Sequence, residues 1–271
     1  MSHLLEVQSA TVAYGIKGAG SHKLALSDVS LSLPEKPSIT AIVGESGSGK
    51  TTITRLMLSL QTPTMGSVRY EGKDLQQMDR KAFLRYRREV QAVFQDPFGV
   101  FNPFYKVDRS LLLPVQRFGL ANSTDEAYAL VRKSLEAVGL RPDDTLGRYP
   151  HQLSGGQRQR IMIARALSLR PRLIVADEPV SMVDASLRAT ILESLYRLKV
   201  DRDVSLLYVT HDLTTAYQIA DRIVVMFNGQ IVEQGDPEQV IHEPKHAYTR
   251  ALVAAVPPPD PSVNWGLEVA A

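Results

Sequence analysis

The sequence contains no cysteine among its 271 residues. Disulfides, thiolate catalysis, iron–sulfur clusters and cysteine-ligated zinc are therefore excluded as functional elements of this chain. A long hydrophobic run is also absent, because no stretch of about 18 apolar residues occurs anywhere. The first residues, MSHLLEVQSATVAY, lack the basic region, apolar stretch and cleavage site of a signal peptide. We therefore expect a soluble, cytoplasmic protein that needs a partner chain for any role at a membrane.

An excess of charge of one sign is missing as well. The chain has 31 basic and 29 acidic residues, for a formal net charge of +2. This balance argues against a general affinity for nucleic acid or for an anionic surface. The basic stretch RYRR (85–88) is interpreted as a solvated face, with a local nucleic-acid patch as the alternative. The 44% hydrophobic and 22% charged residues are ordinary for a globular protein.

The order of strands and helices predicts an α/β fold. SITAIVG (38–44) is a nearly unbroken apolar run, which is typical of a central strand buried on both faces. A helix is expected to follow it at 51–60. The alternation of strands with helices, including one after Ser181 and one at 214–220, predicts a doubly wound, mostly parallel sheet. Other strands are expected at 4–14, 29–33, 90–95, 173–177, 205–211 and 222–235, with a glycine-rich turn at 15–23 and an Asn-Gly hairpin in the last.

The stretch from about 97 to 170 is predicted to be mostly helical. It begins with DPFGVFNPFYKV (96–107), which is rich in proline and aromatic residues and is interpreted as a structured loop. A helix is expected at 123–140, where Ser123 and Glu126 form a capping box and Gly139 ends the helix. Its apolar face is expected to consist of Ala127, Leu130, Val131, Leu135 and Val138.

GESGSGKT (44–51) matches the pattern G-x-x-x-x-G-K-S/T in full, between a buried strand and a helix. The glycines allow backbone N–H groups to point at the phosphates of a nucleotide. Lys50 is expected to reach the β- and γ-phosphates, and the Thr51 hydroxyl to bind Mg²⁺. The flanking strand and helix disfavour the alternative of a chance glycine-rich turn. The predicted nucleotide contacts here are Gly44, Ser46, Gly47, Ser48, Gly49, Lys50, Thr51 and Thr52.

Polar side chains follow three other predicted strands. Asp177 and Glu178 end LIVADE, where Asp177 is expected to hold Mg²⁺ directly or through water, and Glu178 to orient or deprotonate the attacking water. His211 and Gln95 end two more strands, with His211 placed beside the γ-phosphate and Gln95 either binding Mg²⁺ or touching water. Open α/β sheets bind ligands at the carboxyl ends of their strands, so one site is expected. The alternatives are a merely polar strand end, a structural histidine and an ordinary surface glutamine.

LSGGQRQR (153–160) is a second glycine-bearing stretch that leads into a helical pattern. Ser154 is expected to cap a helix that begins near Gln157, and a helix N-terminus favours an anion. The residues alone leave two interpretations open. The stretch is either a second phosphate site or a glycine turn before a buried helix that contains IMIARAL.

In this order, these motifs resemble the nucleotide-binding subunit of ABC transporters. GESGSGKT resembles the Walker A motif, LIVADEP Walker B, LSGGQ the signature, and 181–184 the D-loop. Gln95 resembles the Q-loop glutamine, His211 the switch histidine, and Tyr14 the aromatic residue that stacks on adenine. The resemblance spans about 4–256, and the combination of motifs is highly specific.

The resemblance implies a P-loop nucleotidase fold with a doubly wound, mostly parallel sheet. It adds an N-terminal antiparallel β subdomain and an α-helical subdomain inserted at about 97–170. The ATPase domain is expected at 1–256, followed by a proline-containing tail at 257–271. The implied cofactors are ATP and Mg²⁺, with Lys50, Glu178 and His211 as catalytic residues. The implied metal ligands are Thr51, Gln95 and Asp177.

The resemblance also implies a dimer of two ATPase subunits, either identical or homologous. In this family each ATP lies between the P-loop of one chain and the signature of the other. The partner's nucleotide is then contacted by a helix N-terminus, which stabilises charge as an arginine finger does. The implied contacts are Ser154, Gly155, Gly156 and Gln157, with Asp184 of the D-loop.

Longer stretches resemble the dipeptide, oligopeptide and nickel importer group: VQAVFQDPFGVFNP, YPHQLSGGQRQRIMIARAL and GDPEQVIHEPKHAYTRALVAAVP. This implies a peripheral protein at the cytoplasmic face of the cell membrane. It would power uptake of a solute through integral permease subunits. An extracytoplasmic solute-binding protein would deliver the solute to these subunits. The D-loop region, EPVSMVDAS, departs from the usual EPTSALD type, and the cysteines of a C-terminal iron–sulfur cluster are missing. Four aromatic residues either line a groove for a permease helix or fill the subdomain's core: Phe98, Phe101, Phe104 and Tyr105.

The alternative function is that of a soluble ABC ATPase acting on nucleic acid or ribosomes. Such relatives carry two cassettes in one chain, or long coiled-coil or zinc insertions. This sequence shows one cassette, no coiled-coil pattern and no cysteine, so no nucleic-acid partner is expected. A regulatory cassette that binds ATP without hydrolysing it is disfavoured by the presence of Lys50, Asp177, Glu178 and His211.

Overall fold

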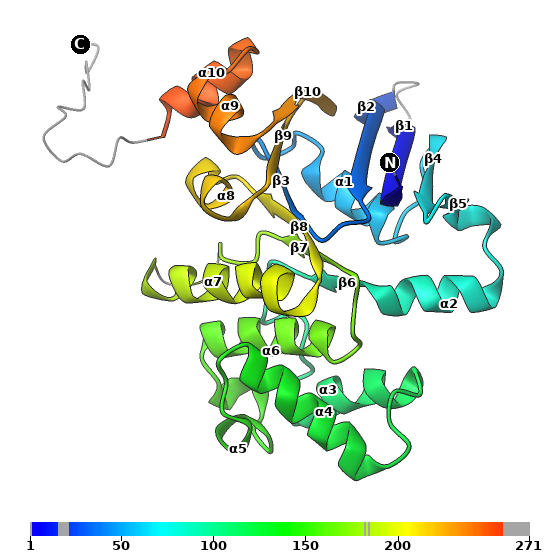
Figure 1. The fold of residues 1–271 in the computed structure, drawn as a ribbon, viewed down its shortest axis with the longest axis vertical. Helices are drawn as coiled ribbons and strands as arrows, with labels where there is room; N and C mark the ends of the chain where they lie inside the picture. Colours follow the sequence, from blue (N-terminus) through cyan, green and yellow to red (C-terminus); the bar gives the residue numbers. More distant parts are fainter. Residues whose placement is uncertain (1, 16–21, 182, 184, 257–271) are drawn as a thin grey trace, which may run out of the picture.

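A six-stranded sheet forms the centre of the fold in the computed structural model, which describes residues 2–15, 22–181, 183 and 185–256 (Figure 1). The predictions for 16–21, Asp184 and the tail at 257–271 lie outside the described residues. The strand order is β10-β9-β3-β8-β7-β6, with β9 to β6 parallel and β10 antiparallel to β9, which confirms the predicted sheet. The strands are β3 (Ile39–Val43), β6 (Val90–Val93), β7 (Leu173–Asp177), β8 (Ser205–Thr210), β9 (Arg222–Phe227) and β10 (Gln230–Gly235).

The strand β3 is buried along its whole length because both faces of the sheet are covered. Ile42 packs with α1 (Lys50–Met57) on one face, while Ala41 and Val43 pack on the other face with α7 (Ala185–Arg202) and α8 (Leu213–Ile219). The helix α1 ends at Met57, three residues before the predicted end, and Ser59 then adopts a left-handed φ of 52°. The prediction of a sheet covered on both faces was therefore right. The predicted end of the helix at residue 60 was wrong.

The second sheet is antiparallel, with the order β2-β1-β4-β5, and lies beyond α1 (Figure 1). Buried residues alternate along β1, as in Leu5 and Val7, which gives the sheet one core face. This confirms the antiparallel β subdomain, although β2 begins well before the predicted 29. The strands are β1 (His3–Gly15), β2 (His22–Pro34), β4 (Met65–Tyr70) and β5 (Lys73–Asp74).

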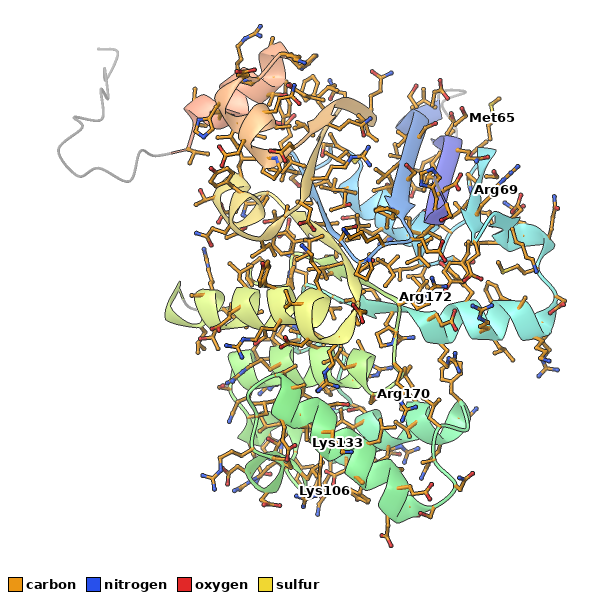
Figure 2. The ribbon with its side chains drawn as sticks, viewed as in Figure 1. Met65, Arg69, Lys106, Lys133, Arg170 and Arg172 are labelled. Atoms are coloured by element: carbon orange, nitrogen blue, oxygen red, sulfur yellow. The ribbon has the colours of Figure 1, made fainter. Side chains whose placement is uncertain are left out.

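An ion-pair network ties this sheet to the parallel one. Glu89, at the end of α2 (Arg80–Glu89), accepts hydrogen bonds from the Tyr70 hydroxyl at 2.6 Å and from Arg85 at 3.0 Å. Arg172, which directly precedes β7, pairs with Glu71 after β4 and is labelled in Figure 2. The stretch 85–88 is thus only partly a solvated face, because Arg85 and Arg88 pair with Glu89 and Tyr86 is buried. An acidic partner for the two arginines also weakens the case for a nucleic-acid patch.

The helices of 107–167 gather at one end of the molecule, away from the antiparallel sheet (Figure 1). Figure 2 shows this separation, with Lys106 and Lys133 at the helical end and Met65 on β4. The segment before them, 96–106, consists of turns, as expected for the proline-rich stretch. The elements are α3 (Val107–Arg117), α4 (Thr124–Ala137), α5 (Pro142–Thr145), the 3₁₀ turn η2 (Pro150–Gln152) and α6 (Gly155–Leu167).

The start of α4 differs from the predicted capping box. Ser123 Oγ accepts the N–H of Glu126 at 3.1 Å, as expected. The Glu126 carboxylate, however, accepts the N–H of Asn122 at 2.8 Å instead of that of Ser123. Only the Ser123 half of the capping box is therefore formed, and the Glu126 side chain bonds the residue before Ser123. Of the predicted apolar face, Leu130 is only half-buried and the other four residues are fully buried.

The chain ends, as far as it is described, in a hairpin and two short helices. Asn228 and Gly229 both have positive φ, 48° and 75°, as the tight turn between β9 and β10 requires. This confirms the predicted hairpin. The remaining elements are η1 (Leu75–Gln77), α9 (Pro237–His242) and α10 (Ala247–Ala254). Within the described ranges, no helix combines the length and the apolar character needed to cross a membrane.

Candidate nucleotide-binding site

A cleft of about 530 Å³ opens at the carboxyl end of the parallel sheet. It brings together most residues that the sequence predicts, from segments as distant as β1 and β8. Gly44, Ser48 and Asp177 are not part of its described lining, while Leu24 and Ala25 are lining residues that the sequence did not reveal. The lining consists of Tyr14, Leu24, Ala25, Ser46, Gly47, Gly49, Lys50, Thr51, Thr52, Gln95, Glu178 and His211.

The loop 44–49 needs glycine at two positions. A Cβ at Gly44 would lie 2.2 Å from the Met226 carbonyl oxygen, and one at Gly49 would lie 2.9 Å from the Ala25 carbonyl oxygen. Both residues have positive φ, 151° and 106°. Gly49 is the N-cap of α1 and contributes no side chain, so the first turn presents backbone N–H groups at the cleft. A helix N-terminus of this kind favours an anion.

Lys50 lies under the loop and is only 6% exposed. Its Nζ donates hydrogen bonds to the carbonyl oxygens of Gly44 and Glu45, both at 2.7 Å. Burial lowers the pKa of the Lys50 ammonium, and the carboxylates of Glu178 and Asp177 oppose that shift. The ammonium is therefore close to both carboxylates but is held by the loop itself.

Asp177 and Glu178 are adjacent in sequence but differ in environment. Burial raises the pKa of Asp177, and the neighbouring charge of Glu178 adds to the effect. Glu178 has a left-handed φ of 47°, which is unfavourable for a residue with a long side chain. Its N–H donates to the Val209 carbonyl at 2.8 Å, and its carbonyl accepts the Ser181 hydroxyl at 3.0 Å. These bonds hold the strained backbone in place.

The carboxylate of Glu178 contacts two of the other predicted side chains. Gln95 Nε2 donates to Glu178 Oε2 at 3.0 Å, and His211 Nδ1 lies 3.2 Å from Glu178 Oε1. Gln95 is not in a strand, because β6 ends two residues earlier, at Val93. The side chains still meet, because β6, β7 and β8 are parallel neighbours in the sheet. The argument from strand ends therefore predicted a real cluster.

Tyr14 lies at the edge of the cleft on β1. It is half-exposed, and its hydroxyl donates to Gln61 Oε1 at 2.9 Å. The contact of its ring with adenine stays a prediction.

The stretch LSGGQ caps a helix far from this cleft. Ser154 Oγ accepts the N–H of Gln157 at 3.2 Å, and Gln157 Oε1 accepts the N–H of Ser154 at 2.9 Å, which completes a capping box. The helix α6 therefore begins at Gly155, two residues before the predicted start. Within the described part of the chain, no residue of 153–157 lines the cleft. The helix beyond is buried at Ile161 and Ile163, as expected for a glycine turn before a buried helix, and the phosphate site at this stretch stays a prediction.

The four aromatic residues after Gln95 differ in how deeply they are buried. Phe101 is buried in the helical part, whereas Phe104 is 84% exposed. The guanidinium of Arg158 lies 4.4 Å above the Phe98 ring, and that of Arg109 lies 4.0 Å from the Tyr105 ring. Phe101 therefore belongs to the core, and the other three lie at the surface.

The glycine loop, the paired carboxylates and the histidine at the strand ends define a P-loop nucleotidase. The chain belongs to the ABC transporter family, because residues 26–181 match the family model described as "ABC transporter". Residues 232–270 match a second model, described as "Oligopeptide/dipeptide transporter, C-terminal region".

Two curated relatives are named as ATP-binding proteins of peptide transport. The oligopeptide transport ATP-binding protein OppF of Streptococcus mutans is 39% identical over 258 residues, which are 95% of this chain and 83% of that protein. The dipeptide transport ATP-binding protein DppF of Lactococcus lactis is 40% identical over 260 residues, covering 95% and 82%.

Two solved structures share the fold. One is the ATP-binding cassette MJ0796, described as a dimer in a post-hydrolysis state bound to ADP and Pi. It has a TM-score of 0.76 and 27% identity, and the match covers 86% of this chain and 98% of that one. The other is cbiO1 of Clostridium perfringens, part of the transporter complex cbiONQ, with a TM-score of 0.76, 25% identity and coverage of 90% and 92%.

Proposed function

We propose that this chain binds Mg²⁺–ATP in the cleft above residues 44–51 and hydrolyses it to power peptide uptake through partner membrane subunits. The observation that carries the proposal is the Glu178 carboxylate, which lies between Gln95 and His211 in the same cleft as Lys50. The names of the OppF and DppF relatives support peptides as the cargo.

The residues present fit Mg²⁺ as the metal. The Thr51 hydroxyl, the Gln95 amide oxygen and the Asp177 carboxylate are oxygen ligands, which Mg²⁺ prefers. Among the described residues, no group of three or more His, Cys, Asp or Glu forms a protein-only metal site. This suits a metal that takes most of its ligands from phosphate and water. When bound, Mg²⁺ supplies charge neutralisation on the phosphates.

The side chains then have distinct roles. The loop N–H groups and Lys50 bind the phosphates, with Lys50 exchanging its contacts to the Gly44 and Glu45 carbonyls for phosphate oxygens. Glu178 accepts a hydrogen bond from the attacking water and receives its proton. Gln95 and His211 hold the Glu178 carboxylate in place, and His211 also contacts the γ-phosphate.

A complete site is proposed to need two chains. The capped N-terminus of α6 does not line its own cleft and is exposed at Ser154, which supports contact with the nucleotide of a second ATPase subunit. The dimer described for MJ0796 supports the same arrangement. Asp184 is expected to take part, although it lies outside the described residues.

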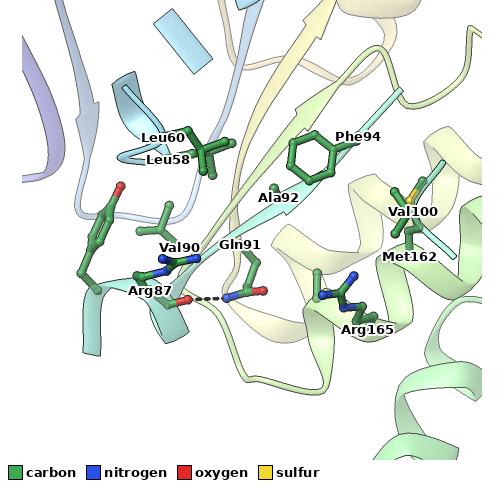
Figure 3. A pocket seen from close by; sticks show the side chains of 12 residues that line it. Leu58, Leu60, Arg87, Val90, Gln91, Ala92, Phe94, Val100, Met162 and Arg165 are labelled. Atoms are coloured by element: carbon green, nitrogen blue, oxygen red, sulfur yellow. Dashed lines mark hydrogen bonds between the residues drawn. The ribbon is translucent and has the colours of Figure 1, made fainter. Parts of the chain in front are cut away.

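A groove between the sheet edge and α6 is proposed as the docking site for the permease subunit (Figure 3). Its described lining includes Phe94 and Val100 but not Phe98, Phe104 or Tyr105. Figure 3 shows Leu58 and Leu60 on one wall, with Met162 and Arg165 of α6 on the opposite wall. The groove thus combines apolar lining residues with Arg87 and Arg165, which suits a short amphipathic helix. Placement at the cytoplasmic face of the membrane follows from this proposed contact.

The groove is tested by Leu60→Glu, which places a charge on an apolar wall at a residue that is 56% exposed. Because burying an unpaired charge is costly, we expect co-purification with the membrane subunits to fall about tenfold or more. ATP binding by the isolated chain should stay unchanged. Met65→Glu is the matched control, since Met65 is 67% exposed on β4 and outside the groove. An equal loss in both variants would contradict the proposed docking site.

The proposed function is tested as a whole in membrane vesicles that hold the complete transporter and its solute-binding protein. Labelled di- and oligopeptides should accumulate only with Mg²⁺ and ATP present, and chelation of Mg²⁺ by EDTA should stop both uptake and phosphate release. ATP hydrolysis without peptide accumulation would refute the proposed cargo.

A further inference from the structure

The helix α10, near the C-terminal end, touches the glycine loop 203 residues earlier in the sequence. The Glu45 N–H donates a hydrogen bond of 2.8 Å to the Tyr248 hydroxyl oxygen. The Tyr248 ring stacks on Phe227, with 4.3 Å between the ring centres and 26° between the planes. Tyr248 lies in the segment that matches the C-terminal region of oligopeptide and dipeptide transporters.

The same part of the chain supports the loop at two other points. The Gly229 N–H, at the tip of the β9–β10 hairpin, donates to the Ser48 carbonyl at 3.0 Å. Gly44 lies so close to the Met226 carbonyl that no side chain fits between them. Phe227, under the Tyr248 ring, belongs to the same strand end. The hairpin and α10 therefore form one support beneath the loop.

The position of Tyr248 is itself fixed by its neighbours. The Glu233 carboxylate accepts the N–H groups of Lys245 and His246, at 2.8 and 2.9 Å. His246 Nδ1 accepts the N–H of Tyr248 at 3.2 Å and caps α10. Burial raises the pKa of the Tyr248 phenol above its usual value, so the oxygen is a neutral hydroxyl at physiological pH.

We infer that Tyr248 is a positioning residue for the phosphate loop, acting on Lys50 through Glu45. The backbone of Glu45 joins the two, because its N–H is bound by the Tyr248 hydroxyl and its carbonyl oxygen by Lys50 Nζ, at 2.7 Å. The Glu45 N–H also shares its peptide group with the Gly44 carbonyl, which accepts from Lys50 Nζ at 2.7 Å, so the hydroxyl fixes a peptide group that binds the ammonium. Through this contact the C-terminal region sets the shape of the loop and, with it, the affinity for nucleotide. The inference rests on the proposed phosphate site at 44–51.

The test is Tyr248→Phe, which keeps the stack on Phe227 and removes only the hydroxyl. A hydrogen bond of this kind contributes about fivefold to an equilibrium. We therefore expect the dissociation constant for fluorescent mant-ATP to rise about fivefold, and KM for ATP likewise, with kcat unchanged. Hydrogen exchange at the Glu45 amide should accelerate by a similar factor, which a general loss of stability would not confine to that amide.

Tyr217→Phe is the matched control, because it removes a hydroxyl that bonds Glu238 and connects α8 with α9. It should leave mant-ATP affinity and Glu45 exchange unchanged. Unchanged affinity in Tyr248→Phe, or an equal loss in both variants, would overturn the inference. Failure of the unaltered chain to bind mant-ATP would instead refute the proposed phosphate site.

Discussion

Replacing Glu178 with glutamine is expected to lower ATP turnover on the order of a thousandfold while ATP binding persists. Glutamine has the size of glutamate but cannot accept the proton of the attacking water. Because Lys50 and the loop are untouched, ATP should still bind and bring two chains together. The closed dimer should then accumulate, since hydrolysis no longer separates it. Phosphate release measures the turnover, and light scattering with ATP present measures the dimer.

Glu193→Gln is the control for this experiment, because Glu193 is an exposed residue of α7 that pairs only with Arg197 among the described ion pairs. Its turnover should match that of the unaltered chain. Unchanged turnover in Glu178→Gln would remove Glu178 from its proposed role. Loss of ATP binding would mean that the Glu178 carboxylate acts on the phosphate loop through Lys50 and does not position the attacking water.

Ser154→Arg is expected to lower turnover by about a hundredfold or more, although each isolated chain still binds ATP. The side chain is exposed at the start of α6, so arginine fits the folded chain but removes the hydroxyl offered to the nucleotide of a second subunit. Loss of one donor at a developing charge costs about 10²- to 10³-fold in rate. Phosphate release and mant-ATP binding by dilute monomer separate the two effects. Gly156 is a poorer target, because a Cβ there would lie 2.8 Å from Leu187 Cδ1.

The two inactive variants provide a sharper test when they are mixed. In a pair of one Glu178→Gln chain and one Ser154→Arg chain, both changes fall in the same composite site and the other site is intact. When equal amounts are mixed before ATP is added, partners exchange freely, half of the dimers are mixed pairs, and activity should return to about a quarter of the unaltered level. No recovery on mixing, or loss of ATP binding by monomeric Ser154→Arg, would mean that the signature acts within its own chain.

The sequence predicted the features that depend on local chemistry. Gly44 and Gly49 are required by the backbone of the loop, and Glu178 and His211 follow parallel strands whose ends meet at one edge. The sequence missed the details of two helix starts, where neighbouring side chains and backbone groups compete for the same hydrogen bonds. Glu126 bonds Asn122 rather than Ser123, and α6 starts at the glycines once Gln157 completes its cap.

The Tyr248 contact has no local signal at all. Its partner is 203 residues away, and the tertiary fold brings the two together. Leu24 and Ala25 reach the cleft in the same way, through the pairing of β2 with β1. Sequence patterns report which face of an element is buried, but the neighbour on that face depends on the whole fold.

The left-handed backbone at Glu178 has a consequence for how such a chain changes over generations. Glycine and asparagine adopt this conformation more easily than glutamate, so a chain freed from hydrolysing ATP would gain stability by exchanging Glu178 for either. Selection for folding alone would therefore act against the residue that is proposed to position the attacking water. The proposed role of Glu178 therefore comes at a cost in folding stability, which is the usual trade-off at an active site.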